Sequence, residues 1–81
     1  MSRDEIFEKL NEIFRDVFDD EDIVVTETTT ADDIEDWDSL EHINLVVAVE
    51  RGFDIKFTMG ETTTLKNVGE MADIIAERLK A

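Results

Sequence analysis

The sequence predicts an all-α protein, a small four-helix bundle with three longer helices, one short helix and a long first loop. Three observations support this prediction. Apolar residues recur at spacings of three and four along three segments, which is the periodicity of an amphipathic helix. Helix-capping residues precede each of these segments. The apolar faces of such helices must pack on one another, because none of them can be buried alone.

The composition bounds the domain organisation and the class of partner. With 81 residues, 42% of them hydrophobic, the chain is expected to form one domain over residues 1–81. Its 22 Asp and Glu against 8 Lys and Arg give a formal charge of −14. Nucleic-acid binding requires a basic surface, so no nucleic acid is expected as a ligand, whereas basic protein partners are favoured.

The composition also excludes several chemistries. Without cysteine the chain has no disulfide, thiolate nucleophile or cysteine zinc site. The acidic runs lack the spacing and the glycine of a calcium-binding helix–loop–helix, so no metal site is predicted. Weak binding of divalent cations to the clustered carboxylates stays open, because it would relieve the self-repulsion of the chain. No apolar run approaches the roughly 18 residues of a membrane span. We therefore expect a cytoplasmic monomer without membrane insertion.

The first predicted helix begins after Ser2, because Ser2 and Glu5 have the spacing of a capping box. Four consecutive carboxylates at 19–22 are unfavourable at the negative end of the helix dipole and end the helix. Its apolar stripe comprises Ile6, Phe7, Leu10, Ile13, Phe14, Val17 and Phe18.

The loop that follows reaches Asp38 and is long for so small a domain, which indicates a functional or self-packed segment. Val25 and Ile34 are expected to anchor this loop in the core. The apolar run at 23–26 allows a short strand, although the chain offers no second run of suitable length to pair with it.

The second predicted helix begins at Asp38, where Glu41 completes another capping box. Gly52 is its expected stop, because glycine easily takes the left-handed backbone conformation that follows a last turn. Its core positions are Leu45, Val46, Val49 and, after the helix, Phe53.

Two more helices complete the bundle. Residues 59–63 allow one short helix, after a short alternating segment at 53–57. Asn67 and Glu70 have the spacing that caps a final helix. The apolar residues of this last helix are Val68, Met71, Ala72, Ile74, Ile75 and Leu79.

Ser39 is the residue best placed for chemistry, since it lies in the first turn of the second helix at the end of the long loop. A phosphate ester on its hydroxyl would meet free backbone N–H groups and the positive end of the helix dipole. From the residues alone, the alternative is that Ser39 is only a further capping residue.

The stretch 38–50, which begins Asp38-Ser39-Leu40, resembles the attachment motif of acyl carrier proteins. In that family the serine carries a 4′-phosphopantetheine arm, whose thiol holds acyl chains as thioesters. The likeness extends through nearly the whole chain. It implies a specialised, stand-alone carrier without catalytic residues, which serves fatty-acid, lipid or specialised acyl biosynthesis.

The resemblance also implies partners and site residues. A phosphopantetheinyl transferase would load Ser39 from coenzyme A, and enzymes that build or transfer acyl chains would bind through basic docking patches. The positions implied in partner binding are Asp38, Leu40, Glu41, Val47 and Glu50. Asp38 is the acidic residue before the serine that modifying enzymes recognise. Glu41 and Glu50 match acidic positions, and Leu40 and Val47 match apolar positions, on the exposed face of the second helix.

The chain departs from the family pattern at several positions. Asp36 and Trp37 replace the glycine–alanine pair that is common before the motif, and Asn44, Arg51 and Gly52 stand where acidic residues are common. The less negative recognition face favours a specialised carrier over a general one. Trp37 either folds back on the first helical turn or forms a surface for the arm or a partner, and it joins the partner-binding set.

Three other functions stay open at this level. The chain could be an acidic interaction adaptor without a prosthetic group, or a peptidyl or aminoacyl carrier. A small hydrolase would pair Ser39 with His42, one turn later, but the sequence offers no oxyanion donors or third residue, and His42 is expected at the surface. A carrier also requires the core to part slightly between helices, which Val, Ile and Met side chains permit.

Overall fold

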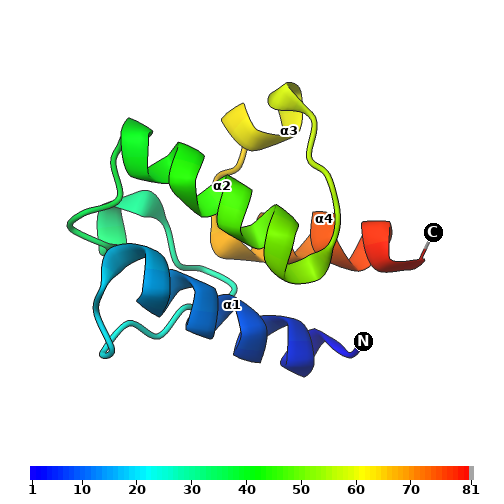
Figure 1. Cartoon of the computed structure of the whole chain (residues 1–81), viewed down its shortest axis with the longest axis horizontal. Coiled ribbons are helices and arrows are strands. Elements are labelled where there is room, and N and C mark those ends of the chain that lie inside the picture. The colour runs from blue at the N-terminus through cyan, green and yellow to red at the C-terminus, as the bar shows by residue number, and fades with distance from the viewer. Residues whose placement is uncertain (81) are drawn as a thin grey trace.

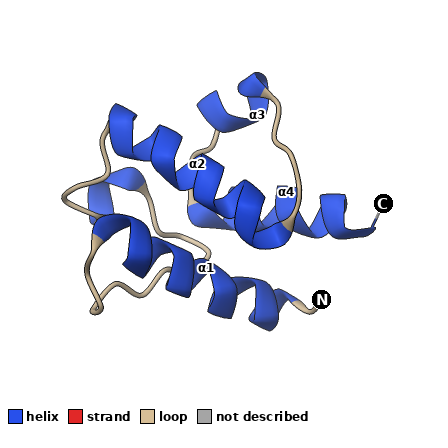
Figure 2. Cartoon of the chain, viewed as in Figure 1, coloured by secondary structure: helices blue, strands red, loops and turns tan. Residues whose placement is uncertain are grey.

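The computed structural model describes residues 1–80, and helices joined by loops account for all of them (Figure 2). The three longer helices are α1 (Arg3–Phe18), α2 (Ser39–Phe53) and α4 (Val68–Lys80), and the short helix is α3 (Met59–Thr63). One turn of 3-10 helix, Ala31–Asp33, interrupts the long first loop. The predicted all-α bundle with three longer helices and one short helix is confirmed.

Helix α1 packs against both α2 and α4, whereas α3 lies at the opposite side of the molecule from α1 (Figure 1). The start of α1 and the end of α4 lie at the same end of the bundle (Figure 1). The core draws on α1, α2, α4 and the first loop. Its buried residues are Ile6, Leu10, Phe14, Phe18, Val25, Leu45, Val49, Phe53, Val68, Met71, Ala72 and Ile75.

The predicted start of α1 is confirmed, because Ser2 and Glu5 form both hydrogen bonds of a capping box. The backbone N–H of Glu5 donates to Ser2 Oγ over 3.2 Å, and the backbone N–H of Ser2 donates to Glu5 Oε1 over 2.9 Å. The helix ends at Phe18, where Asp19 takes the left-handed conformation with φ 50°. Part of the predicted stripe, Phe7, Ile13 and Val17, flanks the core and is half-buried.

Side chains of α1 hold the start of the first loop. Arg15 Nε donates to the carbonyl oxygen of Ile23 over 2.8 Å, and the N–H of Val25 donates to Asn11 Oδ1 over 2.7 Å. These bonds satisfy the backbone there without a neighbouring strand, and the short strand allowed at 23–26 does not form. Val25 is buried and Ile34 packs against the core, as predicted.

The middle of the same loop caps α4. The N–H of Val68 donates to the carbonyl oxygen of Thr29 over 2.8 Å, and the N–H of Gly69 donates to that of Glu27 over 3.0 Å. The first N–H groups of a helix have no hydrogen-bond acceptor within the helix, and here carbonyl oxygens of the first loop accept their hydrogen bonds. The length of the loop is therefore explained by its path from the end of α1 to the start of α4.

Gly52 does not end α2, and this prediction is wrong. The helix continues through Phe53, and Asp54 takes the left-handed conformation with φ 55°. A Cβ at Gly52 would lie 2.7 Å from Ile13 Cδ1 of α1. Gly52 thus provides space for the approach of α1 to α2 and does not terminate the helix.

The predicted cap of α4 is confirmed at Asn67, whose Oδ1 accepts a hydrogen bond from the N–H of Glu70 over 2.9 Å. Glu70 does not reach back to Asn67 as a capping box would require. Its Oε1 accepts instead from the N–H of Lys66 over 2.9 Å. No helix of the described residues has the length and apolarity needed to cross a membrane.

Candidate functional site

Ser39 is exposed at the first position of α2, where the local sequence places a helix N-terminus. Asp38 is the cap, and its Oδ1 accepts a hydrogen bond from the N–H of Glu41 over 2.8 Å. The first intrahelical bond runs from the N–H of His42 to the carbonyl oxygen of Asp38, over 2.8 Å. The N–H groups of Ser39 and Leu40 therefore have no acceptor within the helix, and they face its N-terminal end.

Glu41 completes only half of the predicted capping box. Its side chain does not reach back to Asp38, and its Oε1 accepts a hydrogen bond from Asn44 Nδ2 over 3.1 Å. The cap of α2 is therefore carried by the Asp38 carboxylate, which also suits the positive end of the helix dipole.

Trp37 folds back onto α2 and joins it to the core. Its indole Nε1–H donates to His42 Nδ1 over 3.0 Å, and the two rings stack with centroids 5.9 Å apart and planes inclined by 18°. The indole also meets Phe14 edge-on, at a centroid distance of 5.3 Å. Trp37 therefore folds back on the first turn of the helix, which is the first of its two predicted roles. In this position it is half-buried.

His42 is half-buried, so its predicted surface position is wrong. Because an indole N–H is only a donor, His42 Nδ1 must accept, and the ring proton sits on Nε2. His42 Nε2 then donates to the carbonyl oxygen of Thr62 over 2.8 Å. With both nitrogens engaged, His42 has no free basic nitrogen for the Ser39 proton, which argues against the hydrolase alternative.

A cavity of about 730 Å³ opens beside Ser39. The first loop, the first turns of α2, helix α3 and the segment leading into α4 form its walls. Apolar side chains from these elements include Ile43, Met59, Leu65 and Met71. An exposed hydroxyl at a helix N-terminus, with unbonded first-turn N–H groups and an adjoining apolar cavity, fits a phosphate ester that bears a flexible arm.

An exposed apolar strip continues from Ser39 along α2. Leu40 and Val47, both predicted as contact positions, keep 68% and 42% of their surface exposed. The structure adds Ile43, 61% exposed, and Met59 of α3, 83% exposed, neither of which was predicted from the sequence. The spacing of Ile43, three residues after Leu40 and four before Val47, is the signal that would have found it.

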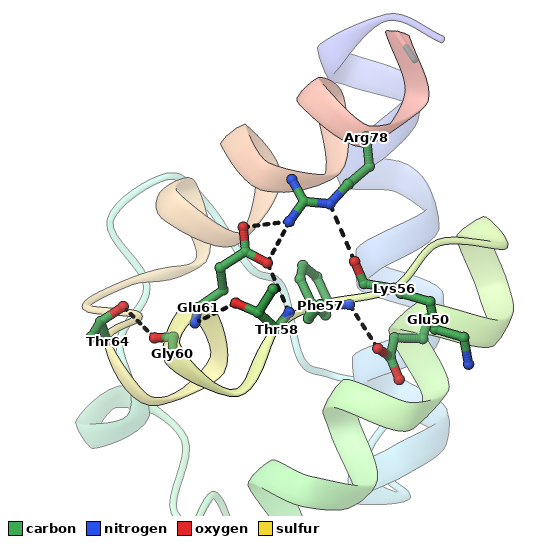
Figure 3. Close-up of polar contacts among 8 residues, drawn as sticks. All are labelled: Glu50, Lys56, Phe57, Thr58, Gly60, Glu61, Thr64 and Arg78. Atoms are coloured by element: carbon green, nitrogen blue, oxygen red, sulfur yellow. Dashed lines mark hydrogen bonds and ion pairs between the residues drawn. The ribbon is translucent and has the colours of Figure 1, made fainter.

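Two of the three predicted acidic contact positions are less exposed than expected. Glu41 and Glu50 are both half-buried. Glu50 Oε2 accepts a hydrogen bond from the N–H of Phe57 over 2.7 Å, which ties α2 to the segment before α3 (Figure 3). Glu50 therefore makes a structural contact within the chain, whereas the sequence predicted only an exposed position for it.

Polar contacts position α3, none of whose residues is buried. Arg78 of α4 donates to both carboxylate oxygens of Glu61 over 2.5 Å, and its Nε donates to the carbonyl oxygen of Lys56 over 3.3 Å (Figure 3). The N–H of Thr58 also donates to Glu61. This backbone hydrogen bond and the Arg78 guanidinium lower the pKa of Glu61 below its ordinary value.

A small helical domain that presents an exposed serine at a helix start, beside an apolar cavity, has the architecture of a carrier domain. Models of known protein families give no match to the chain. Curated relatives do match: it is 36% identical to an acyl carrier protein of Petrotoga mobilis over 80 residues, 98% of this chain and 93% of the relative. It is 40% identical to an acyl carrier protein of Picosynechococcus over 78 residues, 95% of each.

A solved structure agrees with these relatives. The solution structure of a holo acyl carrier protein from Geobacter metallireducens superposes with a TM-score of 0.86 at 50% identity, over 91% of this chain and 85% of that one. The chain therefore belongs to the acyl carrier protein family.

As a member of that family the protein carries acyl groups on 4′-phosphopantetheine, and it works with a phosphopantetheinyl transferase and with acyl-processing enzymes. The group supplies a thiol that holds the acyl chain as a thioester. The relatives do not favour an acidic adaptor without a prosthetic group, or a peptidyl or aminoacyl carrier.

Proposed function

We propose that Ser39 is the residue that bears the phosphopantetheine arm, within a single carrier domain of residues 1–81. The observation that supports this is the exposure of Ser39 at the start of α2, between the Asp38 cap and the apolar cavity. We further propose that the domain has no catalysis of its own, because His42 has no free nitrogen. It works as a monomer in the cytoplasm, where coenzyme A is available.

The loading step balances with coenzyme A as the only donor. Ser39 Oγ attacks the pyrophosphate phosphorus next to pantetheine, a new P–O bond forms, and the pyrophosphate P–O bond breaks. Adenosine 3′,5′-bisphosphate leaves, and a base of the transferase takes the serine proton. The first-turn N–H groups of Ser39 and Leu40 then face the resulting phosphodiester, which the helix N-terminus favours.

Intact mass after incubation with coenzyme A, Mg²⁺ and a broad transferase tests the attachment site. The wild-type chain is expected to gain the mass of one phosphopantetheine, and Ser39→Ala to gain none. The chain has only one other serine, so Ser2→Ala is the matched control and must still be loaded. A mass gain that survives Ser39→Ala contradicts the assignment.

We also propose that partner enzymes bind along the start of α2, through the apolar strip of Leu40, Ile43, Val47 and Met59, with Trp37 beside it. Asp38, Glu41 and Glu50 give this face its negative charge, which suits basic docking patches and speeds encounter. Glu50 contributes its charge although one of its oxygens is bonded within the chain.

Single substitutions test this docking face through the loading rate. Leu40→Ala and Glu41→Lys are each expected to lower the transferase kcat/KM about tenfold, since a buried contact or a reversed charge typically changes binding by 1–3 kcal/mol. Val24→Ala is the control for lost apolar area, because Val24 is 66% exposed on the first loop. Equal losses for Leu40→Ala and Val24→Ala contradict a docking face on α2.

A further inference from the structure

Of the residues that the structure describes in α2, Arg51 is the only charged one that is exposed. The carboxylates of this helix, Glu41 and Glu50, are half-buried, and both accept hydrogen bonds from within the chain. The other exposed residues of α2 are uncharged, namely Ser39, Leu40, Ile43, Asn44 and Val47. A chain with 22 Asp and Glu thus presents a cation on the exposed side of its second helix.

Arg51 lies in line with the apolar strip. Leu40, Val47 and Arg51 are spaced by seven and four residues, which places them on one side of the helix. With a rise of about 1.5 Å per residue, Arg51 lies roughly 18 Å along the helix axis from Ser39. The strip therefore has an exposed carboxylate, that of Asp38, at its start and a guanidinium at its other end.

The guanidinium of Arg51 has no partner within the described chain. The other three arginines, Arg3, Arg15 and Arg78, each donate hydrogen bonds to another segment. Asp54, which lies three residues after Arg51, is exposed, but no ion pair joins the two side chains. Because a guanidinium presents its donors in a fork that matches a carboxylate, Arg51 is free to bind a carboxylate of another molecule.

We propose that Arg51 selects partner enzymes that carry an acidic side chain opposite the C-terminal end of α2. The proposal rests on the proposed function, in which partners dock along the apolar strip and act on the arm of Ser39. Such a partner is basic where it faces Asp38, apolar along the strip and acidic where it faces Arg51. This change of sign fixes the direction in which the partner lies along the helix.

The same change of sign acts against the wrong partners. An enzyme whose docking patch is basic over its whole length would place like charges together at Arg51. Specificity therefore comes from both ends of the strip, because Asp38 attracts a basic surface and Arg51 requires that this surface end before it reaches the last turn of α2.

The rate of the loading reaction tests first whether Arg51 lies in the contact. The probe is a broad phosphopantetheinyl transferase with a basic docking patch, and the substrate is the full chain with coenzyme A and Mg²⁺. Arg51→Glu is expected to raise kcat/KM about fivefold at low salt, because it removes a repulsion at the rim of the interface. Lys80→Glu on α4 is the control for the change of net charge, and its effect should stay below about twofold.

A charge swap then tests the acidic partner residue. Each basic residue of the transferase docking patch is replaced in turn by Glu. At one of these positions the preference is expected to reverse, so that the wild-type chain is loaded with a kcat/KM about fivefold higher than that of Arg51→Glu. Arg51→Lys keeps the charge without the fork, and it should keep the direction of this preference with a smaller factor.

The outcomes separate this inference from the proposed function. If Arg51→Glu and Lys80→Glu change kcat/KM equally, Arg51 lies outside the contact and the inference is wrong. If no Glu variant of the transferase reverses the preference, an acid opposite Arg51 is not selected, and the inference is wrong as well. Both results leave the loading of Ser39 intact. A chain that is never loaded, or that is still loaded after Ser39→Ala, contradicts the proposed function itself.

Sedimentation of the wild-type chain tests the alternative occupant of this face, which is a second copy of the chain. A monomer is expected. A dimer that Arg51→Glu dissociates would place a carboxylate of the second copy opposite Arg51, and it would overturn the choice of a partner enzyme.

Discussion

Gly69 lies where the backbone of the first loop touches the start of α4. Its N–H donates to the carbonyl oxygen of Glu27, and a Cβ at Gly69 would lie 2.5 Å from that same oxygen. A backbone atom cannot turn aside as the end of a side chain can, so the position has no room for a larger residue. Gly60 of α3 is the opposite case, because a Cβ there would meet nothing within 4 Å.

Alanine at these two glycines should therefore change stability in opposite directions. Gly69→Ala is expected to lower the free energy of unfolding by about 1–3 kcal/mol, the usual cost of overpacking. Gly60→Ala is expected to raise it by up to about 1 kcal/mol, because alanine is the better helix former. Urea unfolding of both variants measures the difference. A Gly69→Ala protein as stable as the wild type would show that the loop does not touch α4 in solution.

At the residue scale, local signals were predictable and contacts between distant segments were not. The Asp38 cap and the exposure of Ser39 follow from residues within one helical turn, and the structure shows both. His42 was misplaced at the surface, because its partner Thr62 lies twenty residues further along the chain. No local spacing reports a hydrogen bond to a backbone carbonyl of another helix.

At the scale of elements, α3 differs from the other helices, because polar contacts and not buried side chains hold it. The Arg78–Glu61 ion pair joins it to α4, and the hydrogen bond from His42 Nε2 to the carbonyl oxygen of Thr62 joins it to α2. A helix of five residues is too short to be stable alone. The position of α3, and with it one wall of the cavity, therefore depends on these two contacts.

The contribution of Glu61 should be lost in acid. Its pKa is lowered in the folded protein relative to the ordinary value of 4.5, so its ionised form stabilises the fold at pH values above that. As the pH falls through the folded pKa, the carboxyl is protonated and the contribution disappears. Glu61→Gln should therefore be less stable than the wild type at pH 7.

Urea unfolding of the wild type and Glu61→Gln at several pH values between 7 and 3 measures this effect. The difference between their free energies of unfolding should shrink below pH 4.5. Glu8→Gln is a control, because Glu8 is exposed on α1 and forms no ion pair with the described residues. A difference that stays constant down to pH 3 would contradict a role for the ionised carboxylate.

Element boundaries show the same division between local and distant causes. The helix starts at Ser2 and Asp38 follow from capping residues and were predicted. The end of α2 was predicted at Gly52, but the helix ends one residue later, and Asp54 takes the left-handed conformation instead of a glycine. A Cβ at Gly52 would meet the end of the Ile13 side chain of α1, a contact between helices that sequence periodicity does not encode.

At the scale of the whole molecule, the fold was predictable because helix periodicity and a single core leave few arrangements for three amphipathic helices. The path of the first loop was not predictable, because the carbonyl groups of Glu27 and Thr29 that cap α4 carry no side-chain signal. The cavity also needed the structure, since four separate elements enclose it. Family resemblance supplied the role that we propose for Ser39, which composition and periodicity alone left undecided.

The net charge of −14 acts on the molecule as a whole. The radius of gyration is 11.5 Å, whereas the Debye length is about 30 Å at 0.01 M salt and about 3 Å at 1 M salt. At low salt every carboxylate is therefore repelled by the others across the entire molecule, and at high salt this repulsion is screened. The exposed ion pair between Arg3 and Glu27 weakens with salt as well, but such pairs contribute little.

Thermal unfolding at low and high salt should therefore show a midpoint that rises with sodium chloride concentration. The double variant Glu8→Lys and Glu12→Lys removes two negative charges from the exposed side of α1 and adds two positive ones, so the formal charge changes from −14 to about −10. Less self-repulsion should give this variant a higher midpoint at low salt and a weaker salt dependence. Equal salt dependence in the two proteins would instead assign the effect to local charge clusters, such as the run at 19–22 that both share.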